Sequence, residues 1–137
     1  MALTFLIDTS VLKRLERPEV RHVVEPLAVD ETIGRATVCD LEIGYSARNG
    51  AEWDLLVGAL GMLVKVETSA AHVRRALQVQ RRLAEQSQRG RKIPDLLVAA
   101  AAEELDAVVL HYDADFDRIA AITGQRCRWV VPAGSLE

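Results

Sequence analysis

Four acidic residues stand where carboxylates from distant parts of the chain could act together: Asp8, Glu42, Asp95 and Asp113. Asp8 and Asp113 follow the two most apolar short runs, which are typical of buried parallel strands. Glu42 and Asp95 each stand early in an expected helix. Because ligands bind at the carboxyl ends of the strands in an open α/β sheet, we expect the four acids to converge there.

Such a cluster predicts a bound cation. Two unit charges about 4 Å apart repel each other by roughly 4 kcal/mol at an effective dielectric constant near 20. Four clustered carboxylates must therefore take up protons or hold a positive ion. A ligand set of oxygen atoms, without histidine or cysteine, suits a hard ion such as Mg²⁺ or Mn²⁺.

Each acid also has an ordinary structural interpretation. Asp95 could stabilise the dipole of its helix by about 0.3–1 kcal/mol, and Asp8 could cap the helix that follows it. Glu42 could be a solvated helix residue, and Asp113 could open a turn after its strand. The conjunction of all four at one expected edge of a sheet favours a shared site.

Three neighbouring acids have other expected roles. Asp115 is expected to be the N-cap of a helix that begins at Phe116, although it could also reach a second metal ion. Asp40 is expected to complete a capping box with Thr37 as the N-cap. Asp117 is interpreted as a first-turn partner of its helix dipole.

Hydroxyl and imidazole side chains near the acids are weaker candidates. Thr9 and Ser10 could orient a carboxylate, a metal-bound water or the substrate, or could form a plain turn. His111 could serve as an acid–base group, unless strand alternation turns it away from the site. We expect His22 and His72 to lie on surface helices and assign them no role.

The segment from residue 74 to residue 92 is strongly basic. It contains seven basic residues against the single acid Glu85, a local charge of +6. Arg74 and Arg75 are expected to lie on a solvated helix face. The last three, Arg89, Arg91 and Lys92, lead directly into Asp95 and are candidate substrate-binding residues, because a phosphodiester needs a basic approach to an acidic site.

Length and composition predict a single domain, residues 1–137. Half of the residues are hydrophobic and the formal net charge is −3, which neither indicates nor excludes a nucleic-acid ligand. Cys39 and Cys127 lack metal-ligand spacing and are expected to be buried, reduced thiols. With no signal peptide or membrane span in the sequence, the expected location is the cytoplasm.

Hydrophobic periodicity predicts strands that alternate with helices, as in a parallel sheet covered on both faces. The expected strands are 3–7, 32–36, 63–66, 107–110 and 128–131. The expected helices are 11–15, 19–30, 37–49, 51–60, 69–88, 94–105 and a short one from about 116. No internal repeat or linker divides the chain.

Two longer segments and two shorter features resemble a known family. The segments are Lys92-Ile93-Pro94-Asp95-Leu96-Leu97-Val98-Ala99-Ala100-Ala101 and His111-Tyr112-Asp113-Ala114-Asp115-Phe116-Asp117-Arg118-Ile119-Ala120. Together with the opening Ile7-Asp8-Thr9-Ser10 and the helix that carries Glu42, they resemble PIN-domain ribonucleases, and more closely the VapC toxins of bacterial toxin–antitoxin pairs. Trp129 and Val130 resemble the family's closing strand.

The resemblance implies a three-layer α/β/α sandwich with a mainly parallel sheet, usually assembled as a homodimer. It implies an endoribonuclease that cleaves RNA with Mg²⁺ or Mn²⁺ and is neutralised by a cognate VapB-type antitoxin. By position, the family's acids are Asp8, Glu42, Asp95 and Asp113, with Asp115 as an optional fifth metal ligand.

In that interpretation Asp8 and Asp95 are the principal metal ligands. Glu42 completes the site or activates the attacking water, and Asp113 holds a second ion or its water. One rival is a phosphatase of the haloacid dehalogenase type, which would need an aspartate where this chain has Ser10. The other is a catalytically inactive PIN-like module that binds RNA or protein.

Overall fold

The fold is built on one sheet of five parallel strands. The computed structural model describes residues 2–88 and 92–136. In those residues the strands are β1 (Phe5–Ile7), β2 (Ile33–Ala36), β3 (Val64–Val66), β4 (Val108–His111) and β5 (Cys127–Trp129), in the spatial order β3-β2-β1-β4-β5. β1 therefore lies in the centre, with β4 beside it in the register Ile7↔Leu110.

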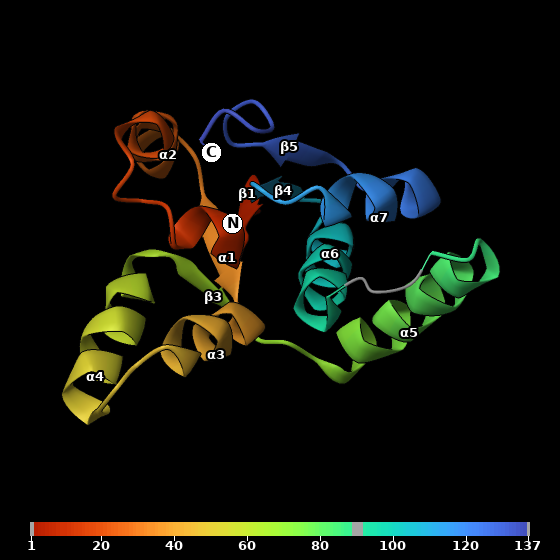
Figure 1. Cartoon of the computed structure of the whole chain (residues 1–137), viewed down its shortest axis with the longest axis horizontal. Helices are drawn as coiled ribbons and strands as arrows, with labels where there is room; N and C mark the ends of the chain where they lie inside the picture. Colours follow the sequence, from red (N-terminus) through yellow and green to blue (C-terminus); the bar gives the residue numbers. More distant parts are fainter. Residues whose placement is uncertain (1, 89–91, 137) are drawn as a thin grey trace.

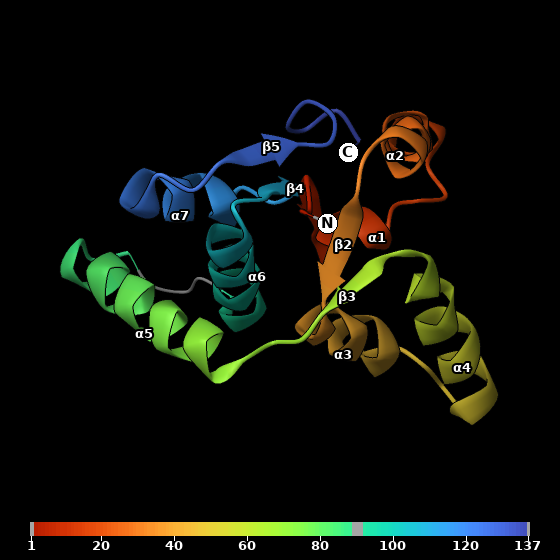
Figure 2. The ribbon, with the colours of Figure 1, turned by 180° about the vertical axis from the view of Figure 1, so that it is seen from behind.

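Helices connect successive strands and cover both faces of the sheet. They are α1 (Thr9–Leu12), α2 (Pro18–Asp30), α3 (Thr37–Tyr45), α4 (Gly50–Gly58), the short 3₁₀ helix η1 (Ala59–Met62), α5 (Ala70–Glu85), α6 (Ile93–Leu105) and α7 (Asp115–Thr123). Helices α5, α6 and α7 lie together on one side of the sheet, and α1, α2 and α4 lie on the other (Figures 1 and 2). This is the expected α/β/α arrangement.

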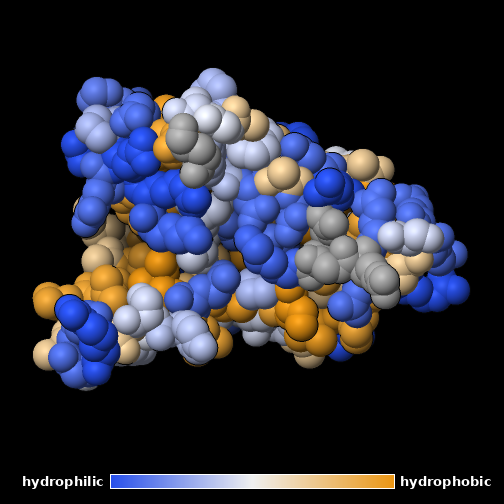
Figure 3. All heavy atoms as spheres, viewed as in Figure 1, coloured by the Kyte–Doolittle hydropathy of each residue, from blue (hydrophilic) through white to orange (hydrophobic). Residues whose placement is uncertain are grey.

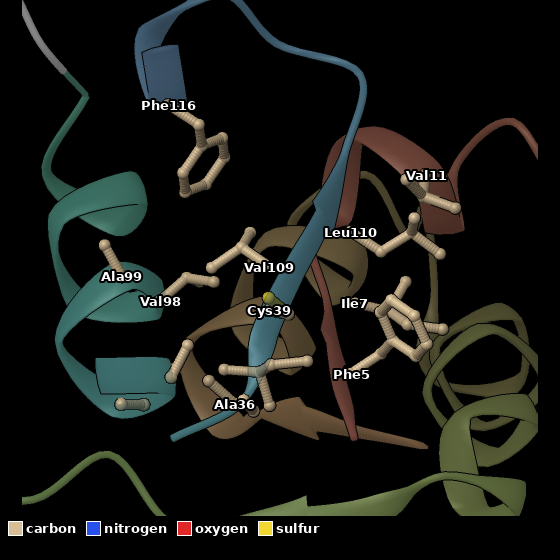
Figure 4. Packing of buried hydrophobic residues seen from close by; sticks show 14 of the residues in the cluster. Phe5, Ile7, Val11, Ala36, Cys39, Val98, Ala99, Val109, Leu110 and Phe116 are labelled. Carbon is tan, nitrogen blue, oxygen red and sulfur yellow. The ribbon is translucent and has the colours of Figure 1, made fainter. Parts of the chain in front are cut away.

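The hydrophobic core has one part on each face of the sheet. Along β4, Val109 points toward Val98 on α6, whereas Leu110 points to the opposite face, toward Val11 (Figure 4). All four of these side chains are fully buried. Both faces of β4 are covered by helices, which is why Val108, Val109 and Leu110 are apolar without polar alternation.

The expected capping box at the start of α3 was wrong. Helix α3 begins at Thr37 itself, and Ala36 occupies the cap position without a side-chain cap. Asp40 instead accepts hydrogen bonds from the buried guanidinium of Arg35, at 2.8 Å from Nε. An unpaired buried guanidinium costs more free energy than a helix end without a side-chain cap. Asp40 therefore pairs with Arg35 and does not cap α3.

Two further local expectations were wrong. His72 is buried rather than on the surface, because it forms a capping box with Ser69 and contacts Glu104 through Nε2 at 3.0 Å. Cys127 is only partly buried, while Cys39 is fully buried, and both are free thiols. Among the described helices, none combines the length and the apolar character needed to cross a membrane.

Gly34 in β2 provides a test of this sheet. A Cβ at Gly34 would lie 2.9 Å from the carbonyl oxygen of Val64 and 3.0 Å from Leu3. We predict that Gly34→Ala lowers the free energy of unfolding by about 1–3 kcal/mol, because a backbone carbonyl cannot rotate away. Chemical denaturation measures the change, with Gly58→Ala as the control, since a Cβ there would meet no atom within 4 Å apart from its own chain neighbours and helix backbone. Equal stability of the two variants would contradict the packing of β2 against β3.

Candidate metal centre

A pocket of about 310 Å³ opens where β1 and β4 end. Its wall includes all four acids that the sequence analysis selected. The other lining residues come from α1 and the two residues after it, from the start of α6 and from the β4–α7 turn: Thr9, Ser10, Lys13, Arg14, Lys92, Tyr112 and Ala114. The structure thus brings together acids as far apart in the sequence as Asp8 and Asp113.

Asp8 has both a structural role and a free ligand atom. It is the N-cap of α1, and its Oδ2 accepts a hydrogen bond of 2.9 Å from the backbone N–H of Ser10. Its Oδ1 is buried and has no hydrogen-bond partner. Burial raises the pKa of Asp8 in spite of the hydrogen bonds from Ser10. Ordinary capping therefore uses one oxygen and leaves the other for a ligand.

Asp95 stands in the first turn of α6, behind Pro94, and is 3 % exposed. Its Oδ2 is also buried without a hydrogen-bond partner. Burial, followed by the negative charges of Asp8 and Asp113, raises the pKa of Asp95 to about 8. A carboxyl group in this position either holds a proton at neutral pH or requires a nearby cation.

Glu42 reaches the pocket from α3. Thr9 donates a hydrogen bond of 2.8 Å from Oγ1 to Glu42 Oε1, so Thr9 orients this carboxylate. Burial raises the pKa of Glu42; the Thr9 hydrogen bond lowers it, and the charge of Asp8 raises it further. The net result is a raised pKa, as for Asp8 and Asp95.

Asp113 differs from the other three acids. Its Oδ2 lies 2.6 Å from the ammonium of Lys92, and its Oδ1 accepts the backbone N–H of Asp115 at 3.0 Å. Burial alone would raise the pKa of Asp113, but these two hydrogen bonds outweigh it and hold the pKa below its usual value. Asp113 therefore remains ionised and paired.

Asp115 does not cap α7 as expected. It is the first residue of that helix, with Ala114 in the cap position, and Asp113 accepts its N–H instead. Its own Oδ1 lies 3.8 Å from Arg118. One carboxylate oxygen from each of Asp95, Asp113 and Asp115 lies within 4.8 Å of the other two. Asp115 is therefore close enough to bind an ion together with Asp95 and Asp113.

The other group of neighbouring ligand atoms contains Asp8, Glu42 and Cys39. Burial, with the charges of Asp8 and Glu42, raises the pKa of the Cys39 thiol to about 12, so this sulfur stays protonated. A protonated thiol is a poor ligand, whereas carboxylate oxygens suit a hard divalent ion. The two partnerless oxygens of Asp8 and Asp95 fit Mg²⁺ or Mn²⁺ for this reason.

Ser10 and His111 support the backbone around the acids. Ser10 Oγ accepts the backbone N–H of Tyr112 at 2.9 Å, and His111 Nδ1 accepts that of Asp113 at 3.1 Å. The His111 ring is fully buried, 4.9 Å from both Phe116 and Trp129, and burial lowers its pKa to about 4. His111 does not line the pocket. This agrees with the alternative expectation that strand alternation turns its side chain away from the site.

Lys13 and Arg14 were missed by the sequence analysis. Arg14 lies over the Tyr112 ring, 4.9 Å from its centroid, and donates to the carbonyl oxygen of Ser10 at 2.8 Å. Both residues are one helical turn beyond Thr9 and Ser10, and that spacing could have identified them. Of the expected basic approach, Lys92 lines the pocket, whereas Arg89 and Arg91 lie outside the described residues.

Fold and site together define an α/β protein with a carboxylate-rich centre at the carboxyl edge of its sheet. Residues 5–122 match the PIN domain, and the chain belongs to the PIN-domain family and to its VapC branch. It is 61% identical to Ribonuclease VapC51 of Mycobacterium tuberculosis (strain ATCC 25618 / H37Rv) over 137 residues, all of both chains. It is 43% identical to Ribonuclease VapC18 of the same strain, across 98% of this chain and 100% of the relative.

Solved structures share the fold at lower sequence identity. VapBC2 from Rickettsia felis, bound to a DNA fragment from its promoter, has a TM-score of 0.77 at 17% identity and covers 93% of this chain and 99% of the other. DNA-bound VapBC from Salmonella typhimurium has a TM-score of 0.77 at 17% identity, with 94% and 99% covered. The overall architecture is therefore that of VapC proteins.

The raised pKa of Asp95 predicts an unusual pH dependence of stability without metal. Its pKa in the folded protein is about 8, above the ordinary value of 3.8, so its ionised form is destabilising in the fold. Between these values the folded protein binds more protons than the unfolded chain, and stability rises as pH falls. Thermal melts in chelator should therefore show a rising Tm from about pH 8 toward pH 5. A Tm that falls through this range would contradict the assigned electrostatics.

Removal of one of the repelling charges should also stabilise the metal-free protein. Asp8→Asn is predicted to raise the Tm of the chelated protein by about 3–5 °C for each kcal/mol of relieved repulsion in a domain of this size. It should also remove most of the stabilisation that Mn²⁺ gives to the unaltered protein, because a ligand that binds only the folded state stabilises that state. Asp117→Asn, outside the pocket, should leave both values unchanged.

Proposed function

We propose that this chain is a metal-dependent endoribonuclease and the toxin of a toxin–antitoxin pair. The observation that carries the proposal is the convergence of Asp8, Glu42, Asp95 and Asp113 on one pocket, with two buried carboxylate oxygens that have no partner. Two relatives, at 61% and 43% identity, are named ribonucleases, which supports the same activity here.

Asp8 and Asp95 would be the principal ligands of the ion, Mg²⁺ or Mn²⁺, and Glu42 would complete the set. When bound, such an ion would lower the pKa of a coordinated water and neutralise the negative charge that develops on the phosphate. Burial of these acids strengthens every charge interaction in the pocket, because the local dielectric constant is lower than in water.

Glu42 is the residue we assign to the attacking water. Thr9 holds one of its carboxylate oxygens, which leaves the other to orient the water and accept its proton. The raised pKa of Glu42 favours this role, because a general base works best when its pKa approaches the working pH. No covalent intermediate is required.

Lys13 and Arg14 would bind the substrate backbone. They directly follow α1 and are basic residues of the pocket wall, four positions after Thr9 and Ser10. Arg14 is held in place by Tyr112 and by the carbonyl of Ser10, so little side-chain freedom is lost when it contacts a phosphate. Ser10, Arg89 and Arg91 remain proposals for substrate contacts.

The exposed apolar face of α3 supports an antitoxin partner. Leu41 and Tyr45 are one helical turn apart, and their exposed fractions are 76% and 92%. Apolar surface also gathers along α4 beside them (Figure 3). We propose that a VapB-type antitoxin covers this face, in line with the VapBC complexes that share the fold, and that the toxin is a cytoplasmic homodimer.

Loss of one ligand charge should abolish catalysis without unfolding the protein. We predict that Asp95→Asn lowers the rate of cleavage of total RNA at least about 100-fold, since a metal ion stabilises the transition state by several kcal/mol. Asp117→Asn is the matched control, because its side chain contacts Trp129 and not the pocket. Wild-type cleavage by Asp95→Asn would refute the site, and an unaltered protein that binds RNA without cleaving it would favour an inactive binding module.

Removal of a pocket cation should weaken RNA binding. Lys13→Gln is predicted to lower RNA affinity and to reduce the slope of log affinity against log salt by about 0.7, the value for one lost contact with single-stranded phosphate. Binding is measured with Asp95→Asn as the background, so that RNA remains intact. An unchanged salt slope would mean that Lys13 does not contact the substrate backbone.

Polar substitutions on α3 should weaken the complex with the antitoxin. The double variant Leu41→Ser/Tyr45→Ser is predicted to bind the product of a small reading frame beside the gene at least about tenfold more weakly, a change of about 1.4 kcal/mol. Val29→Ser, an equally exposed apolar site on α2, serves as control. Equal losses in the two variants would place the antitoxin elsewhere.

A further inference from the structure

We propose that Lys92 is a built-in cation that takes the place of a second metal ion, so that the centre binds a single divalent ion. The inference rests on the proposed function and specifies how the four acids divide their work. It is carried by the contacts of Asp113 and by the difference between those contacts and the contacts of Asp8 and Asp95.

Both carboxylate oxygens of Asp113 already have partners within the chain. Oδ2 contacts Lys92 Nζ at 2.6 Å, and Oδ1 accepts the N–H of Asp115 at 3.0 Å. A charge-assisted pair at this distance is a strong one. In contrast, Asp8 Oδ1 and Asp95 Oδ2 are buried and have no partner. The oxygens that need a cation are therefore on Asp8 and Asp95, and those of Asp113 do not need one.

The position of Lys92 matches the place where a second ion would be expected. Asp95, Asp113 and Asp115 form the ligand group beside it, with atoms within 4.8 Å of one another. Lys92 is the N-cap residue of α6, three residues before Asp95, so its backbone is anchored to the same helix as the acid. An ammonium group there neutralises one negative charge, as a bound metal ion would, and it stays charged at neutral pH.

The two sides of the pocket thus differ in the source of positive charge. On the Asp113 side the chain supplies it through Lys92, whose side chain is 59% exposed, against 16% for Asp113. On the side of Asp8 and Asp95, the buried oxygens Asp8 Oδ1 and Asp95 Oδ2 have no hydrogen-bond partner among the described residues. A phosphodiester substrate in this pocket would then meet one divalent ion and one lysine.

The test counts bound ions. Metal-free protein is titrated with Mn²⁺ by calorimetry, and the bound ion is counted independently by electron paramagnetic resonance. The unaltered chain should bind one Mn²⁺. Lys92→Gln should bind two, because the charge of Asp113, beside Asp95, is then no longer neutralised by a lysine. The double variant Lys92→Gln/Asp113→Asn should return to one.

Lys13→Gln is the matched control. Lys13 lines the same pocket, and the variant removes the same charge without removing a contact to Asp113, so its count should stay at one. Two ions in the unaltered chain, or one in Lys92→Gln, would overturn the role of Lys92 and leave the metal-dependent nuclease intact. No bound Mn²⁺ in the unaltered chain, together with RNA cleavage that resists chelator, would overturn both proposals.

Discussion

Mutual repulsion among buried carboxylates is the constraint on which the rest of this structure depends. β1 and β4 are adjacent and in register, so the residues that follow them, Asp8 and Asp113, must be neighbours. Helix α6 packs across both strands and adds Asp95 to the same end of the sheet. Burial makes each charge costly, and proximity makes the charges oppose one another. An α/β sheet that concentrates acids in this way requires a source of positive charge.

The surrounding groups provide partners for some of these carboxylate oxygens and not for others. Thr9 holds Glu42, the backbone N–H of Ser10 holds one oxygen of Asp8, and Lys92 neutralises Asp113. These contacts fix the orientation of the acids but leave Asp8 Oδ1 and Asp95 Oδ2 without partners. Incomplete satisfaction of two buried oxygens is costly for a structural element and is expected for an ion-binding centre. The same two oxygens therefore account for the destabilisation predicted for the metal-free protein and for the metal binding proposed here.

The sequence allowed prediction of the parallel sheet and of the convergence of the four acids, because Asp8 and Asp113 directly follow apolar strands. It could not predict contacts that depend on packing between distant elements. Arg35 takes Asp40 away from the expected capping box, and Asp113 replaces Asp115 in binding the start of α7. The interaction of Lys92 with Asp113 joins residues 21 positions apart, and no local pattern indicates it.

The ionisation of Asp95 reports directly on the repulsion among these carboxylates. Nuclear magnetic resonance of ¹³C-labelled aspartate carboxyls, with Asp95→Asn to assign the resonance, follows this titration in metal-free protein and again with saturating Mg²⁺. Asp95 should titrate with a pKa near 8 without metal and should be ionised throughout the neutral range with Mg²⁺. An Asp95 resonance that titrates near its ordinary value of 3.8, and does not respond to Mg²⁺, would contradict the central claim that buried, mutually repelling carboxylates create the ion-binding centre.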